Sequence, residues 1–129
     1  MNRCSVNQVQ RLFLPNVNSG TIPLVYGLSA EYPEICFPML GLHPCDVKET
    51  KDDENLNYRD ELKAIHQAVN SNKFYAIGEI GIDLYWDKST LGIQKEAFIT
   101  QIGWAKELDL PIVIHCREAF DEIFEILET

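Results

Sequence analysis

The chain has 129 residues, the length of one ordinary domain, and 46% of them are apolar, which is enough for a buried core. Its formal net charge of −9 argues against a broad basic groove for nucleic acid, although a metal site can still handle phosphates because the metal supplies the positive charge. The sequence has no apolar run of about 18 residues, so we expect no membrane span. Residues 1–10 are mostly polar and lack an apolar signal core, which predicts a cytoplasmic protein.

The cysteines show no metal-binding spacing. Cys4, Cys36, Cys45 and Cys116 form no Cys-x-x-Cys pair and fit no zinc knuckle. Two of them, Cys36 and Cys116, lie within runs that are typical of strands. We interpret all four as reduced structural thiols, with redox or metal roles as the alternative.

Short apolar runs alternate along the chain with amphipathic segments. Each run has the composition of a buried strand, although Pro38 weakens the second one locally. Strands that alternate with helices indicate βαβ units and a parallel sheet. The expected strands are residues 11–17 (RLFLPNV), 36–43 (CFPMLGLH), 74–82 and 111–116 (PIVIHC).

Helices are expected between and after these strands, because apolar residues there recur at i, i+3 and i+4. The acidic stretch KETKDDEN within residues 44–57 is expected to form a solvated loop. The expected helices are residues 21–32, 58–70, 91–108 and 119–127. Their apolar positions, which are predicted to face the core, are Leu24, Val25 and Leu28; Leu62, Ile65 and Val69; Ile93, Ala97, Phe98, Ile102, Ala105 and Leu108; Phe120, Ile123, Phe124 and Leu127.

Two α/β folds use this alternation. A small doubly wound parallel sheet suits the length of the chain. A (β/α)₈ TIM barrel needs about 250 residues, so this chain would supply only about half of one. Length alone therefore favours the doubly wound sheet, and the residues at the strand ends are the next evidence to weigh.

Polar residues fall at the ends of the expected strands. The first strand runs into Asn16 and the second ends at His43. The third carries Glu79 near its carboxyl end with Asp83 beyond it, and the fourth ends at His115. In parallel α/β folds the chemistry gathers at the carboxyl ends of strands, so we expect these groups to converge on one face. A carboxylate among apolar residues is costly unless it is paired, hydrogen-bonded or bound to a metal.

Each of these side chains also has a purely structural interpretation. Glu79 would pair with a buried Arg or Lys. His43 would cap a strand before a proline-led loop, and His115 would be a core histidine with its hydrogen bonds satisfied. Arg117 by itself would be a surface cation. Asp83 is interpreted as an orienting hydrogen-bond acceptor rather than as a ligand.

Three further ring-bearing residues receive no role in the expected site. Trp86 and Trp104 are interpreted as packing residues, because large aromatic side chains contribute most to cores. His66 lies in an expected helix, and we expect it to be exposed.

Several stretches together resemble the TatD-type metal-dependent deoxyribonucleases, a family of amidohydrolase-like (β/α)₈ barrels. Gly-Glu-x-Gly-[Ile/Leu]-Asp and His-x-Arg are quite specific in combination, whereas either alone is weak. The resemblance implies that residues 1–129 are part of a TIM barrel, about strands two to five with their helices. The stretches are GLHP (41–44), IGEIGID (77–83), QKEAFITQIGWAKELDLPIVIHCR (94–117) and residues 2–17, which are similar to the end of the family's first helix and its second strand.

The resemblance also implies a role for each site residue. Glu79 resembles the carboxylate that bridges two divalent metals, which would be Mg²⁺, Mn²⁺ or Zn²⁺, and His115 resembles a ligand of the second metal. His43 resembles a histidine that faces the substrate rather than the metal, and Arg117 would hold a phosphate. Asp83 would accept a hydrogen bond and orient a metal ligand. The implied reaction is cleavage of phosphodiester bonds in DNA by a metal-activated water.

Other parts of the family's pattern do not occur in this chain. The family opens with a His-x-His strand and carries a further histidine and an aspartate at later strand ends. We therefore interpret the chain as a central piece of a barrel without the first strand and the C-terminal part, and expect this piece to be inactive. Its open edges predict self-association. The alternative function is a non-catalytic α/β domain that binds a ligand or a partner.

Overall fold

The computed structural model describes residues 2–49 and 57–129, and strands and helices alternate in it as expected. The bounds of α4 agree with the prediction, and those of the other expected elements differ by a few residues. The expected loop over residues 44–57 lies mostly outside the described residues. The elements are α1 Asn2–Val6, β1 Leu12–Pro15, a 3₁₀ turn Ser19–Thr21, α2 Ile22–Glu31, β2 Cys36–Met39, a 3₁₀ turn Pro44–Asp46, α3 Tyr58–Ser71, β3 Ile77–Asp83, α4 Leu91–Leu108, β4 Ile112–Arg117 and α5 Phe120–Leu127.

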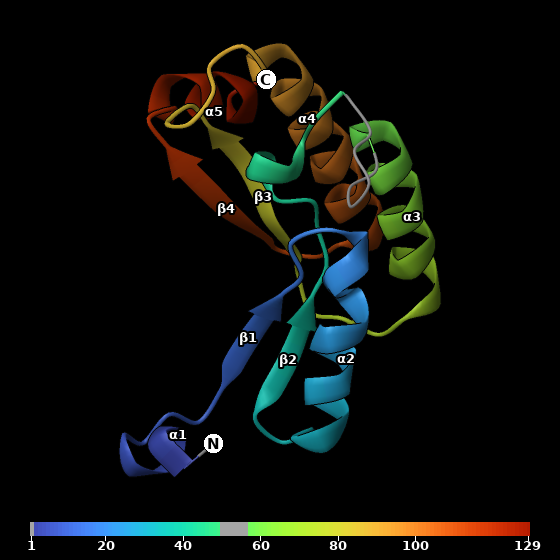
Figure 1. Ribbon diagram of the computed structural model, residues 1–129, viewed down its shortest axis with the longest axis vertical. Coiled ribbons are helices and arrows are strands. Elements are labelled where there is room, and N and C mark those ends of the chain that lie inside the picture. The colour runs from blue at the N-terminus through green and yellow to red at the C-terminus, as the bar shows by residue number, and fades with distance from the viewer. Residues whose placement is uncertain (1, 50–56) are drawn as a thin grey trace.

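The strands pair in parallel, β1 with β2 and β3 with β4. A single parallel bridge between Leu40 and Ile77 joins the two pairs. Figure 1 shows α2, α3 and α4 along one side of the described strands, which leaves the other side open. A doubly wound sheet carries helices on both faces. This arrangement is therefore that of a piece of a barrel wall, with its helices on the outside.

The core lies between β3 and the two helices α3 and α4. Ile77, Ile80, Ile82 and Phe98 have no exposed surface. These residues explain the apolar character of β3, because their side chains are fully removed from solvent. The inward face predicted for α3 is confirmed, and its buried apolar residues are Tyr58, Leu62, Ile65 and Val69.

The inward faces predicted for α2 and α4 are partly wrong. In α2 only Val25 is buried, whereas Leu24 and Leu28 are exposed. An i, i+4 spacing of apolar residues predicts a helix, but it does not show which side of that helix packs on β2. In α4 the centre is buried as predicted, but Leu108 in the last turn is exposed.

The apolar face predicted for α5 is mostly uncovered. Ile123 is buried, whereas Phe120, Phe124 and Leu127 are exposed. The main contacts of α5 among the described residues are with β3 and β4. The periodicity therefore predicts the helix correctly, whereas the prediction that the whole apolar face is buried is wrong.

Two of the three expectations for ring-bearing residues are wrong. Trp104 is buried as predicted, and the ring of His66 stacks on it at a centroid distance of 4.8 Å, so His66 is half-buried rather than exposed. Trp86 is 74% exposed and therefore does not pack in a core. It follows β3 in the connection to α4, and connections of this kind run over the surface.

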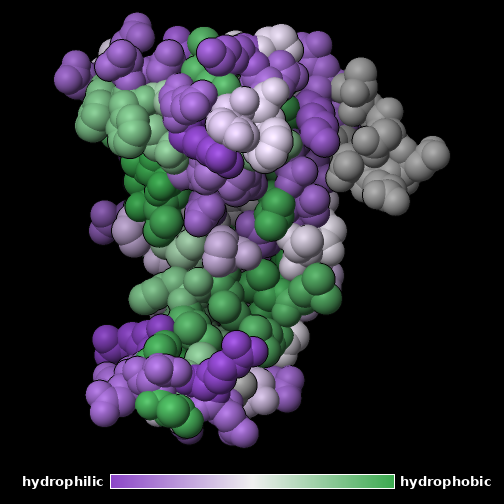
Figure 2. Space-filling model, turned by 60° about the vertical axis from the view of Figure 1, so that its left-hand side comes forward, coloured by the Kyte–Doolittle hydropathy of each residue, from purple (hydrophilic) through white to green (hydrophobic). Residues whose placement is uncertain are grey.

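The open side of the strands carries apolar residues. Phe13 and Val113 are 57% and 37% exposed, and with Pro15, Met39 and Glu79 they help to line a cavity of ≈ 380 Å³. Figure 2 shows hydrophobic residues gathered across the middle of one face of the molecule. The described residues thus leave an apolar face uncovered, as a piece of a barrel would.

No described helix has the length and apolar character needed to cross a membrane. The four cysteines are free thiols, of which Cys36 in β2 is buried and Cys45 is exposed. Their interpretation as structural residues stays a prediction.

Candidate metal centre

The backbone of β3 is shaped around Glu79. The register between β3 and β4 shifts between Gly78 and Ile80, so Glu79 is an extra residue without a partner in β4. A bulge of this kind re-aims a side chain and often lies next to a functional site. A Cβ atom on Gly81 would overlap the carbonyl oxygen of His115. Glycine at this position therefore allows β4 to approach closely enough to bring His115 near Glu79.

Glu79 lies closer to the amino end of its strand than predicted. It is the third of seven residues in β3, which begins at Ile77 and ends at Asp83. The strand begins later than expected because pairing with β4 starts at Ile77 and Ile112, and it extends to Asp83 because that residue still pairs with Arg117. The predicted position of Glu79 near the carboxyl end of the strand is therefore wrong, although Glu79 does lie close to His115 as expected.

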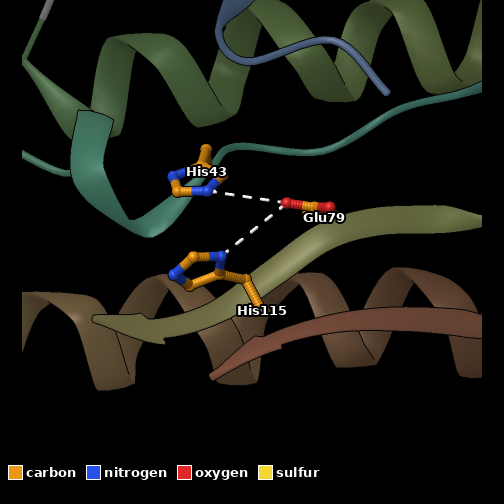
Figure 3. Close-up of side chains that lie close together, drawn as sticks. All are labelled: His43, Glu79 and His115. Carbon is orange, nitrogen blue, oxygen red and sulfur yellow. Dashed lines mark ion pairs between the residues drawn. The ribbon is translucent and has the colours of Figure 1, made fainter. Parts of the chain in front are cut away.

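Three side chains from separate segments meet at one point (Figure 3). His43 precedes the 3₁₀ turn Pro44–Asp46, Glu79 comes from β3 and His115 from β4. His43 Nε2 and His115 Nδ1 lie 3.5 and 3.8 Å from the same oxygen, Glu79 Oε2. The three side chains are half-buried, and one ligand atom from each lies within 4.8 Å of the others. The prediction that Glu79 and His115 lie on neighbouring strands and point to the same place is confirmed.

The two histidines are held in different ways. The backbone N–H of Cys45 donates a hydrogen bond to Nδ1 of His43 at 3.1 Å, which leaves Nε2 facing Glu79. In His115 the opposite nitrogen faces the protein, since Nε2 lies 2.8 Å from Oδ2 of Asp83 and Nδ1 faces Glu79. Each ring therefore presents one nitrogen to the centre, but a different one.

Burial lowers the pKa of His43 below its ordinary value of 6.5, and the neighbouring His115 lowers it further. The carboxylates of Glu79, Asp46 and Asp83 act in the opposite direction but do not outweigh burial. His43 is therefore neutral at pH 7. Because a neutral imidazole has one donor and one acceptor nitrogen, the hydrogen bond that Nδ1 accepts places the proton on Nε2.

Asp83 is buried and fully used as a hydrogen-bond acceptor. Burial acts to raise the pKa of its carboxyl group, but hydrogen bonds from His115, the Tyr85 N–H and the Cys45 thiol hold the pKa below 3.8. The contact has the opposite effect on the pKa of Cys45: burial and the charge of Asp83 raise the thiol pKa to about 11. At pH 7 the pair is thus a carboxylate beside a protonated thiol.

Two buried glutamines of α4 hold the chain near the centre. Gln94 Oε1 accepts from the Asp83 N–H at 2.8 Å, and its Nε2 donates to the Asp83 carbonyl at 3.0 Å. Gln101 Oε1 accepts from the Leu42 N–H at 2.7 Å, next to His43. The sequence interpretation missed both glutamines. The signal that could have found them is their separation of about two helical turns, which puts both on the face toward the strands.

Two strand-end residues lie apart from the three-residue cluster. Asn16 is buried and accepts a hydrogen bond from the Gly41 N–H at 2.8 Å, so it ties β1 to the segment after β2. Arg117 is exposed at the end of β4, with its guanidinium carbon 3.6 Å from the centroid of the Tyr85 ring.

The profile of the TatD-related DNase family matches residues 1–129. The chain belongs to this family. It is 36% identical over 126 residues to the uncharacterized metal-dependent hydrolase YabD of Bacillus subtilis strain 168, a match that covers 98% of this chain and 46% of YabD. It is 32% identical over 125 residues to the 3′-5′ ssDNA/RNA exonuclease TatD of Pectobacterium atrosepticum, which covers 97% and 45%. The chain thus spans about half the length of the curated relatives it matches.

A solved structure gives the same result for the fold. The crystal structure of YjjV, a TatD homologue from Escherichia coli K12, matches with a TM-score of 0.83 and 27% sequence identity. The match covers 98% of this chain and 47% of YjjV. The fold is therefore α/β and part of a TIM barrel, as the TatD resemblance implied, and the doubly wound alternative is wrong.

Proposed function

We propose that the TatD-family residues Glu79 and His115 hold a divalent metal ion in a hydrolase that cleaves phosphodiester bonds in DNA. The observation that carries the proposal is the contact of 3.8 Å between His115 Nδ1 and Glu79 Oε2, with the other nitrogen of His115 turned to Asp83. A carboxylate and an imidazole are donors that Mg²⁺, Mn²⁺ and Zn²⁺ accept to different degrees. The residues present therefore fit such an ion.

His115 is prepared as a ligand by Asp83. The low pKa of Asp83 keeps it a carboxylate, which can only accept hydrogen bonds, so the proton of a neutral His115 lies on Nε2 and points to Asp83. The lone pair of Nδ1 then faces Glu79. A carboxylate behind a ligating histidine orients the ring in this way in many metal sites.

His43 is oriented to donate a hydrogen bond rather than to bind a metal. Its Nδ1 accepts from the Cys45 N–H, so the Nε2 that faces Glu79 carries the proton. A nitrogen with a proton donates a hydrogen bond and offers no lone pair to a metal. This supports a role for His43 toward a substrate phosphate oxygen, although its Nε2 lies within reach of the same carboxylate.

A divalent ion at this place, when bound, lowers the pKa of a water molecule and polarises the phosphodiester. Glu79 and His115 would hold the ion, His43 would donate to a phosphate oxygen, and Arg117 would bind phosphate with its planar donors. Two ions are expected for a complete family site by resemblance. Because the matched relatives are about twice as long as this chain, we propose that further ligands come from parts of the barrel that these 129 residues do not span.

The test is hydrolysis of single-stranded DNA and of bis(p-nitrophenyl) phosphate by the full-length protein with Mg²⁺ or Mn²⁺. Glu79→Gln and His115→Asn should reduce turnover by at least about a thousandfold, since each removes a ligand. Glu107→Gln, an exposed glutamate in α4, is the matched control and should leave turnover unchanged. Full turnover in Glu79→Gln, or no metal-dependent turnover in the wild type, would contradict the proposal, and the second result would favour a non-catalytic binding domain.

A further inference from the structure

An exposed group of flat side chains lies beside the candidate metal centre. Tyr85 and Trp86, which follow β3, are 47% and 74% exposed. Their ring centroids lie 4.7 Å apart at an interplanar angle of 90°. The guanidinium carbon of Arg117 lies 3.6 Å from the Tyr85 ring centroid and 5.7 Å from that of Trp86. Single exposed aromatic residues need no explanation, but two together with a stacked arginine resemble a binding surface.

This group is fixed in position relative to the centre. The Tyr85 N–H donates to Asp83 Oδ1 at 2.9 Å, and Asp83 Oδ2 lies 2.8 Å from His115 Nε2. Arg117 pairs with Asp83 in the β3–β4 ladder and lies two residues beyond His115. One buried carboxylate therefore sets the place of both the aromatic pair and the predicted metal ligand.

A cavity opens next to Trp86. Its volume is ≈ 240 Å³, and its lining includes Trp86, Asp83, Cys45, Lys48 and Gln94. This is smaller than the pockets of about 300–1,000 Å³ that take drug-sized ligands, and it suits one planar ring system. Its charged lining residues are the exposed Lys48 and the acidic Asp83 and Asp87.

We propose that Tyr85, Trp86 and Arg117 form a stacking platform for an unpaired base of a single-stranded nucleic acid. The inference rests on the proposed function, because the platform places the phosphate next to that base toward the Glu79–His115 centre. Every base has a face that stacks on an aromatic ring, whereas the bases of a duplex are already stacked inside it. The platform therefore selects single strands over duplexes without reading their sequence.

The charge of the chain supports stacking over a purely electrostatic mode of binding. With a net charge of −9 the molecule lacks the general basic surface that holds nucleic acid by its phosphates. Arg117 and Lys48 are the cations beside the platform, but Asp83 and Asp87 in the cavity wall offset them, so the aromatic faces supply most of the attraction. We therefore expect only a modest loss of affinity when the salt concentration is raised.

The test is the affinity of the full-length protein for a labelled thymidine oligonucleotide, measured by fluorescence anisotropy in EDTA so that nothing is cleaved. Stacking contributes about 1–3 kcal/mol per base, so Trp86→Ala should weaken binding by about fivefold or more. Trp86→Phe should retain most of the affinity, and Leu24→Ala, an equally exposed control in α2, should retain all of it. An abasic oligonucleotide should bind the wild type as weakly as the thymidine strand binds Trp86→Ala.

The outcomes separate the platform from the proposed function. Equal affinities of the wild type and Trp86→Ala, or equal affinities for thymidine and abasic strands, would overturn the platform even if metal-dependent hydrolysis is observed. Affinity for single strands that depends on Trp86 would support the platform even if no metal-dependent turnover is found. A duplex that binds as tightly as the single strand, and loses as much affinity in Trp86→Ala, would also contradict the platform.

Discussion

The two strand pairs of the molecule have the same parallel pairing, and in each pair the inner strand is buried while the outer strand is not. In β3–β4, Ile77, Ile80 and Ile82 of β3 are fully buried, whereas no residue of β4 is buried. In β1–β2, Cys36 and Met39 of β2 are buried, whereas Phe13 of β1 is exposed. Glu79 therefore comes from a buried strand and His115 from an outer one. A metal centre needs ligands held to within fractions of an ångström, and for His115 the hydrogen bond to Asp83 provides this where burial does not.

The connection between the pairs decides where His43 lies. The bridge from Leu40 to Ile77, the hydrogen bond of Gln101 to Leu42 and that of Asn16 to Gly41 all involve the segment just before His43. The position of His43 relative to Glu79 therefore depends on contacts between the two pairs, whereas that of His115 depends on contacts within one pair. The predictions that follow test this difference, beginning with the largest effect.

Gly81→Ala should be the most destabilising single substitution in the β3–β4 pair. The added Cβ would overlap the His115 carbonyl oxygen, and a φ of +152° is strained for an alanine. We expect the free energy of unfolding to fall by about 3 kcal/mol or more. Gly92→Ala is the control, because open space surrounds that helical glycine, and it should be neutral or stabilise the protein by up to about 1 kcal/mol. Urea denaturation of both variants would show equal stability if β4 did not approach β3 so closely.

The second prediction compares a buried helix position with an exposed one. Phe98→Ala in α4 removes a fully buried ring and should cost about 3–5 kcal/mol in unfolding free energy. Leu24→Ala in α2 removes a side chain that is 72% exposed and should change it by no more than about 0.5 kcal/mol. Thermal or urea denaturation measures both. Similar losses for the two variants would mean that α2 is covered by something in solution, as the predicted self-association would require.

The sequence predicts the covered helices of the fold better than the uncovered helix faces. The bounds of α4 and the burial of α3 were predicted correctly because their apolar residues recur at helical spacing and strands do cover them. The exposure of Leu24, Leu28 and Phe124 could not be predicted, because periodicity shows that a face is apolar but not whether a neighbour lies against it. Self-association, inactivity of the isolated chain and a cytoplasmic location stay predictions.

The candidate site was predictable where a motif sits in a strand. Glu79 and His115 were found because chemistry-bearing residues in neighbouring parallel strands meet at one face. The bulge at Glu79 was not, because it depends on how β3 pairs with β4 rather than on either sequence alone. The platform was missed because a tryptophan is expected to be buried, whereas in the folded chain Trp86 lies outside the core beside Arg117.

The third prediction concerns the connection between the pairs. Gln101→Leu leaves the buried Leu42 N–H without its acceptor, which should cost about 1–3 kcal/mol. The control Gln67→Leu changes an exposed glutamine of α3 and should cost much less. Amide hydrogen exchange should also become faster at Leu42 in the first variant. Unchanged protection of that amide would show that Gln101 does not hold the segment before His43.

The most direct test of the metal centre is the position of Zn²⁺ in crystals of the full-length protein, located by anomalous diffraction at the zinc edge. We predict an anomalous peak about 2.0–2.2 Å from an oxygen of Glu79 and from Nδ1 of His115, while Nε2 of His43 keeps its proton and stays out of coordination distance. A peak coordinated by His43 Nε2 in place of His115 would contradict the assignment of the two histidines. Zinc bound at neither Glu79 nor His115 would contradict the metal centre itself.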